Sequence, residues 1–333
     1  MALLTANKVF QMNGVTVSEK IIPDGTRWKD GAKAKKAGFA AGSLYKKQQR
    51  LSGGTGKVQG VTIHNTADLD NVHDDGEQYT RATYNENMGS VRVHYYVDDT
   101  GAWQNLKAGT GLCANDPVGS AEVSWHAGDG STPDGGNMTT LSMEVIMGDT
   151  AAHDEKAKDN AARMAAWLLW KYGLTIDKLF SHTYWVNKSA GKHFADADVD
   201  RQCTNPIRNQ KWCPTYIFGS SNPDTALKNW KTFKQLVQGY MDALTGGAQA
   251  PAPDTAGTLY RVQTGAFSSK ANAATYAKKL KAAGFDTYMV KADGLYKVQV
   301  GAFGKKENAE AQMQKLTAAG FQAFVTTKSG TPA

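Results

Sequence analysis

The sequence has no run of 18 consecutive apolar residues, so we do not expect a transmembrane helix. Cysteine is also scarce. Three residues in 333 are too few for a disulfide scaffold, which favours synthesis in a reducing compartment. The first residues, MALLTANKVFQMNG, lack the basic segment, apolar core and small-residue cleavage site of a secretory signal. We therefore expect a protein made in the cytoplasm without a signal peptide, and no membrane insertion.

Several common catalytic patterns are missing as well. There is no HExxH zinc-protease motif and no GxSxG nucleophile motif. The segment GGTGKV at residues 53–58 is similar to a phosphate-binding loop, but Val58 stands where the metal-binding Ser or Thr is required. Hydrolases built on those two motifs and P-loop nucleotidases are therefore not expected.

Acidic residues are few only near the C-terminus. Residues 257–333 contain 11 Lys or Arg and 4 Asp or Glu, so they carry the whole net charge of +7. The first 256 residues are balanced in charge and contain all eight tryptophans and all three cysteines. Such different compositions predict two domains. The basic one favours an anionic or polyol-rich polymer as partner, although a solvated lysine-rich surface would give the same charge.

A segment without large apolar residues separates these two stretches. It reads TGGAQAPAPDTAGT from Thr245 to Thr258, which is the Gly, Ala and Pro composition of a linker. We therefore predict a first domain at residues 1–244, a flexible linker at 245–257 and a second domain at 258–328.

The second domain contains an internal repeat with a spacing of 36 residues. LYRVQTGAF at 259–267 returns as LYKVQVGAF at 295–303, and KKLKAAGF at 278–285 returns as QKLTAAGF at 314–321. Each copy begins with the alternating pattern of a strand. A helical pattern that ends in glycine follows, and then a second strand. Two β-α-β halves predict a small ferredoxin-like βαββαβ domain.

The first domain alternates between strand and helix patterns. Buried strands are expected at residues 57–66, 92–98 and 141–148. Amphipathic helices are expected at residues 154–172, with Asp154 as the N-terminal cap, and at 222–244. This alternation predicts an α/β domain.

Three residues of the first domain have the side chains of a zinc site. His64 lies in the expected strand VTIHNT, His182 in LFSHTYW and Cys213 in KWCP. Each of them alone is more readily explained as a structural residue. Two histidines and one cysteine together are a known ligand set for catalytic zinc, with the fourth position open to water.

These segments, with WHAG at 125–128 and SMEV at 142–145, follow the order found in zinc-dependent N-acetylmuramoyl-L-alanine amidases. Over residues 60–218 the first domain resembles the type-2 amidases, the superfamily of T7 lysozyme and the peptidoglycan recognition proteins. That resemblance implies a mixed central sheet flanked by helices. The second domain resembles SPOR domains, which bind peptidoglycan, through its Y-[RK]-V-Q-x-G-A-F strands and A-A-G-F helix ends. The combination is similar to endolysins of clostridial phages.

The resemblance implies that His64, His182 and Cys213 bind one zinc ion (Zn2+) per chain. The spacing departs from the family, because thirty residues separate His182 from Cys213 and relatives often have far fewer. The intervening segment contains His193 and Cys203, so a different third ligand stays open. The K-x-C-P context favours Cys213.

The same resemblance implies catalytic roles for Glu144, Lys211 and His126. Glu144 matches the family's strand glutamate, which exchanges protons with the attacking water and the leaving nitrogen. Lys211 precedes the third ligand by two residues, and His126 lies in the WHAG segment. Either could stabilise an oxyanion. The plainer interpretations are an ion-paired carboxylate, an exposed lysine and a histidine that supports a loop.

We therefore expect a zinc-dependent amidase that cleaves the bond between N-acetylmuramic acid and L-alanine. The expected setting is a phage endolysin, made in the host cytoplasm and acting on the cell wall after release. The alternatives are a host autolysin, a non-catalytic peptidoglycan-binding protein and an L-alanyl-D-glutamate peptidase. The expected partner is bacterial peptidoglycan, with glycan strands bound by the second domain and no nucleic acid.

Overall fold

A computed structural model describes residues 4–66, 73–191, 198–206, 212–245, 260–285, 287–303, 306–328 and 331–332. The chain divides into two compact units, Met1–Leu169 with Thr175–Tyr240, and Trp170–Leu174 with Met241–Ala333. Apart from Thr245, the expected linker at 245–257 lies outside the described residues, and the expected domain limits stay predictions. Among the described helices, none has the length and apolar character needed to cross a membrane.

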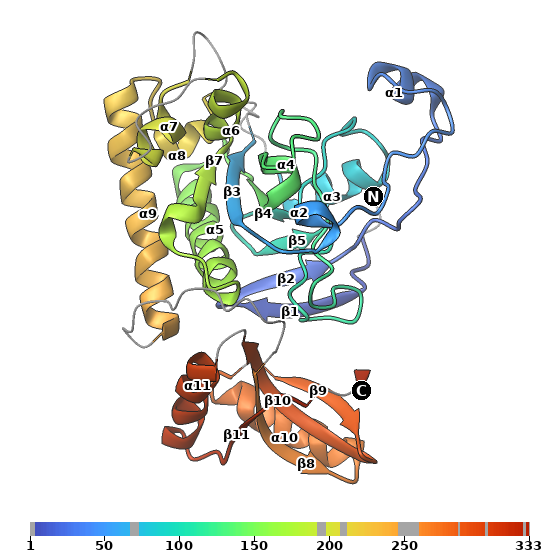
Figure 1. Ribbon diagram of the computed structural model, residues 1–333, viewed down its shortest axis with the longest axis vertical. Coiled ribbons are helices and arrows are strands. Elements are labelled where there is room, and N and C mark those ends of the chain that lie inside the picture. The colour runs from blue at the N-terminus through green and yellow to red at the C-terminus, as the bar shows by residue number, and fades with distance from the viewer. Residues whose placement is uncertain are drawn as a thin grey trace. The chain divides into compact units, whose positions relative to one another are not determined.

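A mixed sheet of seven strands forms the centre of the first unit (Figure 1). Its strands are β1 (Lys8–Met12), β2 (Val15–Glu19), β3 (Gly60–Asn65), β4 (Tyr95–Val97), β5 (Ala102–Gln104), β6 (Thr140–Val145) and β7 (Leu179–Ser181). They lie in the order β1-β2-β5-β4-β6-β3-β7. The β1–β2 and β4–β5 pairs are antiparallel, and the other four pairs are parallel. The predicted mixed α/β fold is confirmed.

The central strand β3 lies between two parallel neighbours, β6 and β7. All six of its residues are buried, as expected for a strand with parallel neighbours and helices around it. In such sheets the carboxyl ends of parallel strands meet at one edge, where loops can present functional groups. His64, near the end of β3, is therefore placed at that edge.

Helices surround this sheet. They are α1 (Gly31–Lys36), α2 (Leu51–Gly54), α3 (Gly76–Tyr84), α4 (Gly136–Thr139), α5 (Ala151–Lys171), α6 (His182–Ser189), α7 (Val199–Thr204), α8 (Thr215–Phe218), α9 (Pro223–Thr245) and the 3₁₀ turn η1 (Ile176–Lys178). The two long helices α5 and α9 lie side by side (Figure 1). The Arg163 guanidinium of α5 is 4.4 Å from the ring centroid of Tyr240 in α9.

Helix α5 begins at Ala151, three residues before the predicted start. The backbone N–H of His153 donates to Thr150 Oγ1 at 3.3 Å, so Thr150 supplies the cap. The Asp154 carboxylate instead accepts a hydrogen bond from the Gly148 N–H at 2.8 Å. The prediction that Asp154 is the N-cap was therefore wrong. An acidic residue is favoured anywhere in the first turn, which is why the pattern misplaced the start.

The second unit is a sandwich of one antiparallel sheet and two helices. Its elements are β8 (Tyr260–Phe267), α10 (Lys270–Ala282), β9 (Tyr288–Ala292), β10 (Leu295–Phe303), α11 (Lys306–Ala318), β11 (Phe324–Thr326) and β12 (Thr331–Pro332). The sheet order is β11-β8-β10-β9-β12. Its first four strands have the βαββαβ arrangement, so the predicted ferredoxin-like fold is confirmed. The additional edge strand β12 was not predicted.

Equivalent positions of the repeat fill the core of the second unit. Val262 and Val298 are both fully buried, and they lie 36 residues apart. The same spacing relates two further buried pairs, Ala273 with Ala309 and Leu280 with Leu316. Each half thus contributes an equivalent strand valine and two equivalent helix residues to a shared apolar core, and the second half adds Val300.

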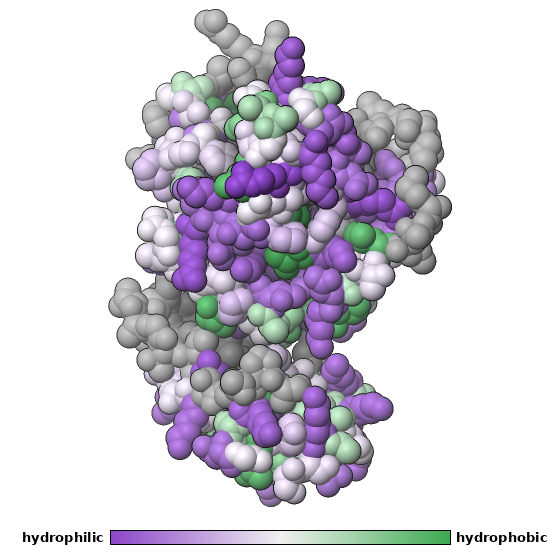
Figure 2. Space-filling view, turned by 90° about the vertical axis from the view of Figure 1, so that its right-hand side faces the viewer, coloured by the Kyte–Doolittle hydropathy of each residue, from purple (hydrophilic) through white to green (hydrophobic). Residues whose placement is uncertain are grey.

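The visible surface is mainly polar. On the face shown in Figure 2, hydrophilic residues predominate and hydrophobic ones are scattered between them. Scattered apolar residues are normal on a folded surface.

Candidate metal centre

Strands β3 and β6 place His64 and Glu144 beside one another. The two residues are directly paired in the parallel register, as are Ile63 with Met143 and Asn65 with Val145. Side chains of paired residues in adjacent strands project from the same face of the sheet, and the strands lie about 4.8 Å apart. The His64 imidazole and the Glu144 carboxylate therefore belong to the same face.

His182 lies directly after β7, the neighbour of β3 in the sheet. It is the first residue of α6. Ser181 caps this helix, since its hydroxyl accepts a hydrogen bond from the Tyr184 N–H at 3.1 Å. The Ser181 hydroxyl also donates to the Cys203 carbonyl at 2.7 Å. This cap fixes where α6 begins and so where His182 lies.

Cys213 is held against the start of α6 by hydrogen bonds with Thr183. The Cys213 N–H donates to Thr183 Oγ1 at 3.1 Å, and the Thr183 N–H donates to the Cys213 carbonyl at 3.2 Å. Just beyond, the Tyr216 N–H donates to Asn65 Oδ1 at 3.1 Å. The loop that carries Cys213 is thereby attached both to the residue after His182 and to the residue after His64.

The ligand atoms of these three residues converge. Nδ1 of His64 is 3.1 Å from Nδ1 of His182 and 3.8 Å from Sγ of Cys213, and all three ligand atoms lie within 4.8 Å of one another. Tetrahedral zinc bonds of about 2.0–2.1 Å to nitrogen and 2.3 Å to sulfur separate such atoms by roughly 3.3–3.7 Å. The side chains present therefore fit a zinc ion, and each of the three residues is buried.

The two alternative third ligands are placed differently. Cys203 is fully buried in α7 and belongs to none of the groups of described residues that could hold a metal. Burial raises the pKa of its thiol to about 12, which disfavours the thiolate that zinc requires. His193 lies outside the described residues. The structure therefore brings Cys213, rather than Cys203, to the two histidines.

His126 is buried beside His64, and both of its ring nitrogens are engaged. Nδ1 is 2.8 Å from Nε2 of His64, and Nε2 is 3.2 Å from the Gly136 carbonyl. Burial first, and then the neighbouring His182 and His94, lower the pKa of His126 well below its usual value, so the ring is neutral. Because the carbonyl can only accept, His126 Nε2 carries the proton and its Nδ1 accepts the proton of His64 Nε2.

This proton arrangement defines the tautomer of His64. With its Nε2 protonated toward His126, the Nδ1 atom of His64 presents a lone pair toward His182 and Cys213. Histidine ligands of metals characteristically donate their second N–H to such an outer partner, which orients the ring. The role of His126 at a substrate oxyanion, expected from the sequence, stays a prediction.

Glu144 is the one residue of β6 that is not fully buried. On its other side it pairs with Tyr96 of β4, a buried residue whose hydroxyl lies 2.9 Å from Thr83 Oγ1. Glu144 thus lies between His64 and Tyr96 in the sheet and is partly exposed to solvent. Lys211, the remaining candidate, lies outside the described residues.

Two supporting residues were not foreseen from the sequence. Asn137 Oδ1 accepts hydrogen bonds from the N–H groups of His126 and Ala127, each at 2.7 Å, and so holds the WHAG loop. Thr183 holds Cys213 as described above. Neither residue stands in a recognisable pattern, since a polar side chain that binds a distant loop leaves no local signal.

Comparison with known families gives two matches. Residues 54–215 match the N-acetylmuramoyl-L-alanine amidase family, and residues 256–327 match the SPOR domain. These matches confirm the two kinds of domain expected from the sequence motifs. No curated protein matches the chain.

Three of the solved structures that are similar to parts of this chain are the following. A mutant endolysin from Bacillus subtilis is 21% identical over 67% of this chain and 99% of that chain, with a TM-score of 0.42. The Staphylococcus aureus hydrolase AmiA is 17% identical over 69% and 99%, with a TM-score of 0.40. The peptidoglycan binding domain of the B. subtilis cell wall lytic enzyme CwlC is 46% identical over 23% and 96%, with a TM-score of 0.21.

Proposed function

We propose that this chain, in which an N-acetylmuramoyl-L-alanine amidase domain is followed by a SPOR domain, cleaves peptidoglycan with one zinc ion held by His64, His182 and Cys213. The bond cut is the amide between N-acetylmuramic acid and L-alanine. The observation that carries the proposal is the convergence of two imidazole nitrogens and one thiol sulfur within 4.8 Å, in a buried site beside Glu144. A non-catalytic binding protein has no need of that complete set.

Amide hydrolysis needs a strong nucleophile and stabilisation of negative charge on the carbonyl oxygen. When bound, zinc supplies both, because it lowers the pKa of water to about 7 and polarises a carbonyl. The chain's task is to hold the ligands in one geometry. Ser181, Thr183 and Asn65 do this through the cap of α6 and the hydrogen bonds to the Cys213 loop.

Glu144 is the general acid–base of the proposal. It lies in register with His64 on the same face of the sheet, so its carboxylate can reach water near the three ligands. It accepts a proton from the attacking water and then transfers that proton to the leaving nitrogen of L-alanine. Its partial exposure gives this proton a path that the buried residues of β6 lack.

His126 is a positioning residue in this proposal. It accepts the Nε2 proton of His64 and thereby keeps the His64 Nδ1 lone pair directed at the other two ligands. Charge stabilisation by a protein cation is left to Lys211, a role supported by its place two residues before Cys213.

The SPOR domain binds peptidoglycan, and we propose that it prefers glycan strands from which stem peptides have been removed. Such strands are the product of the amidase domain. Attachment to them would raise the local concentration of the catalytic domain at sites already being degraded.

The test is analysis of digested cell walls by mass spectrometry together with metal content. We expect about one zinc per chain in the amidase centre and products with a new N-terminal L-alanine. A new N-terminal D-glutamate would indicate the L-alanyl-D-glutamate peptidase instead. Cys213→Ser is the inactive control, and Cys203→Ala is its matched partner. Intact walls after treatment with zinc-loaded protein would support the non-catalytic alternative.

A further inference from the structure

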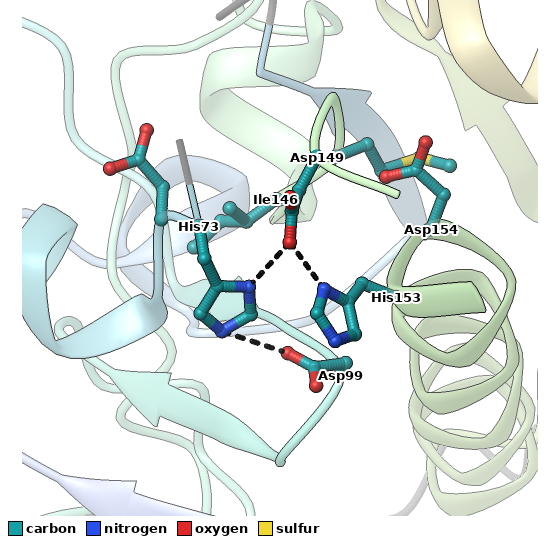
Figure 3. A pocket seen from close by; sticks show the side chains of 8 residues that line it. His73, Asp99, Ile146, Asp149, His153 and Asp154 are labelled. Atoms are coloured by element: carbon teal, nitrogen blue, oxygen red, sulfur yellow. Dashed lines mark hydrogen bonds and ion pairs between the residues drawn. The ribbon is translucent and has the colours of Figure 1, made fainter. Parts of the chain in front are cut away.

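A second group of metal-ligating side chains lies apart from the His64, His182 and Cys213 set. It consists of His73, Asp149 and His153, and it shares no residue with the amidase centre. His73 precedes α3, Asp149 follows β6, and His153 lies in the first turn of α5. Figure 3 shows both imidazole rings turned toward the Asp149 carboxylate.

The ligand atoms of these three residues lie close together. Nδ1 of His73 is 2.8 Å from Oδ2 of Asp149, and Nδ1 of His153 contacts the same oxygen from the other side. The ring centroids of the two histidines are 4.6 Å apart. As in the amidase centre, the three ligand atoms all lie within 4.8 Å of one another.

A second carboxylate supports the arrangement. Asp99, in the turn between β4 and β5, lies 3.6 Å from Nε2 of His73 through its Oδ1 atom. A metal-binding histidine typically directs its second nitrogen to a carboxylate, which orients the ring and increases its basicity. His73 therefore has a ligand atom on one side and an orienting carboxylate on the other, while both carboxylates are only 17% exposed.

We propose that His73, His153 and Asp149 bind a second divalent transition-metal ion, of the class of zinc, with Asp99 as the orienting carboxylate. Two imidazole nitrogens and one carboxylate favour zinc, cobalt, nickel or copper over calcium and magnesium, which prefer oxygen ligands. The ion would connect the start of α5 to the segment before α3. Its role would be structural, because the site shares no residue with the His64, His182 and Cys213 set.

The rival explanation is a metal-free ion-pair cluster. In it the Asp149 carboxylate is held by the two imidazoles alone, which fits the raised pKa of His73 and the lowered pKa of Asp149. The two explanations differ in stoichiometry. The cluster binds no metal, whereas the proposed site adds one equivalent to whatever the amidase centre binds.

Equilibrium dialysis of the chelator-stripped full chain against zinc distinguishes them. We expect two equivalents of zinc for the wild type, and one equivalent each for His73→Gln/His153→Gln and for Cys213→Ser. The variant that combines all three substitutions should bind none. Asp74→Asn is the matched control, because Asp74 lines the pocket around His73, Asp149 and His153 but is not one of the three proposed ligands. It should keep two equivalents. The proposal is overturned if His73→Gln/His153→Gln binds as much zinc as the wild type.

Two further readouts separate this site from the amidase centre. Cobalt at Cys213 gives a sulfur-to-metal charge-transfer absorption, whereas the proposed site has only nitrogen and oxygen ligands and gives none. In the Cys213→Ser background, zinc should still raise the thermal unfolding temperature, because a ligand of the folded state stabilises it. If zinc does not raise the unfolding temperature of Cys213→Ser, the second site is refuted. If the wild type loaded with cobalt shows no charge-transfer band, only the amidase centre is refuted.

Discussion

Nε2 of His64 lies 2.8 Å from Nδ1 of His126, and the other nitrogen of His126 lies 3.2 Å from the Gly136 carbonyl. This chain of contacts turns Nδ1 of His64 toward His182 and Cys213. The backbone carbonyl of α4 thus sets the tautomer of a residue in β3, through one intervening histidine. The histidine that the sequence suggested as an oxyanion donor therefore also contacts the His64 ring.

His126→Ala should therefore weaken zinc binding by about 10–100-fold, the usual effect of losing an outer partner of a ligand. His126→Asn should recover part of that loss, since its side-chain oxygen can occupy the position of Nδ1. Zinc affinity is measured by competition with a chromogenic chelator. If His126→Ala lowers turnover at saturating zinc while affinity stays at the wild-type level, the histidine acts on the substrate instead.

The two buried cysteines of the C-terminal half of the amidase domain should behave oppositely. In the His73→Gln/His153→Gln background, Cys213→Ala should remove the zinc of the amidase centre and activity together, because it deletes a ligand atom 3.8 Å from His64 Nδ1. Cys203→Ala should retain both and lose only about 1–2 kcal/mol of stability from a small buried cavity. Zinc content by mass spectrometry and unfolding in urea give the two quantities. In that background, retention of zinc and activity by Cys213→Ala together with their loss in Cys203→Ala would reverse the assignment.

Glu144→Gln should lower turnover by about 10²–10⁴-fold, the usual contribution of a general acid–base. The amide keeps the size of the side chain, so zinc content and folding should stay unchanged. Hydrolysis of a soluble muramoyl-peptide measures the effect, with metal content determined on the same sample. Turnover near the wild-type value in zinc-loaded Glu144→Gln would exclude the proposed role.

His94 should make the fold sensitive to acid. Burial lowers its pKa from 6.5 to about 3, while its Nε2 donates to the Glu122 carbonyl at 2.9 Å and its Nδ1 accepts from the Ser142 N–H at 3.0 Å. Between these values the unfolded chain binds a proton that the folded chain does not. The contribution of His94 to the free energy of unfolding is complete above pH 6.5. It is lost as the pH falls, by at most about 1.4 kcal/mol per pH unit.

Urea unfolding of metal-free protein between pH 4.5 and 7 measures this slope. His94→Gln should be less stable at neutral pH but should show a shallower loss toward acid. His73→Gln is the contrasting variant, because Asp149 raises the pKa of His73. The stabilisation that His73 gives the fold is present at low pH and is lost as the pH rises through the pKa of His73 in the folded protein. Equal slopes in the wild type and His94→Gln would contradict the assignment.

The SPOR domain should bind walls better after amidase treatment. Residues 257–333 carry the net charge of +7, so simple attraction to anionic wall polymers is the competing explanation. That attraction should fade with salt, because the Debye length is about 8 Å at physiological ionic strength. Binding to purified walls is measured against salt, with and without pretreatment by the amidase domain. A cationic anchor alone would show salt-sensitive binding and no effect of pretreatment.

Local pattern predicted three of the seven strands of the first unit, β3, β4 and β6, and its two long helices, but not the other strands and the short helices. The apolar segment around Val61 and Ile63 predicted β3 as a buried strand, and the 36-residue repeat predicted two equivalent halves with the buried valines Val262 and Val298. Amphipathic helices are predictable because burial of one face imposes a periodicity on neighbouring residues. Such patterns locate ends poorly, as Ala151 at the start of α5 shows, because several residues near a helix terminus can satisfy its free N–H groups.

The identities of His64, His182 and Cys213 as a set were also available from the residue types and their segments. The K-x-C-P context already favoured Cys213 over Cys203, whereas the order of residues could not provide the tautomer of His64 or the grouping of His73 with His153. Each of these depends on atoms from segments far apart in the chain meeting within a few ångströms. Distances of that kind arise from strand register, helix caps and side-chain hydrogen bonds across the fold, and they leave no periodic trace along the chain.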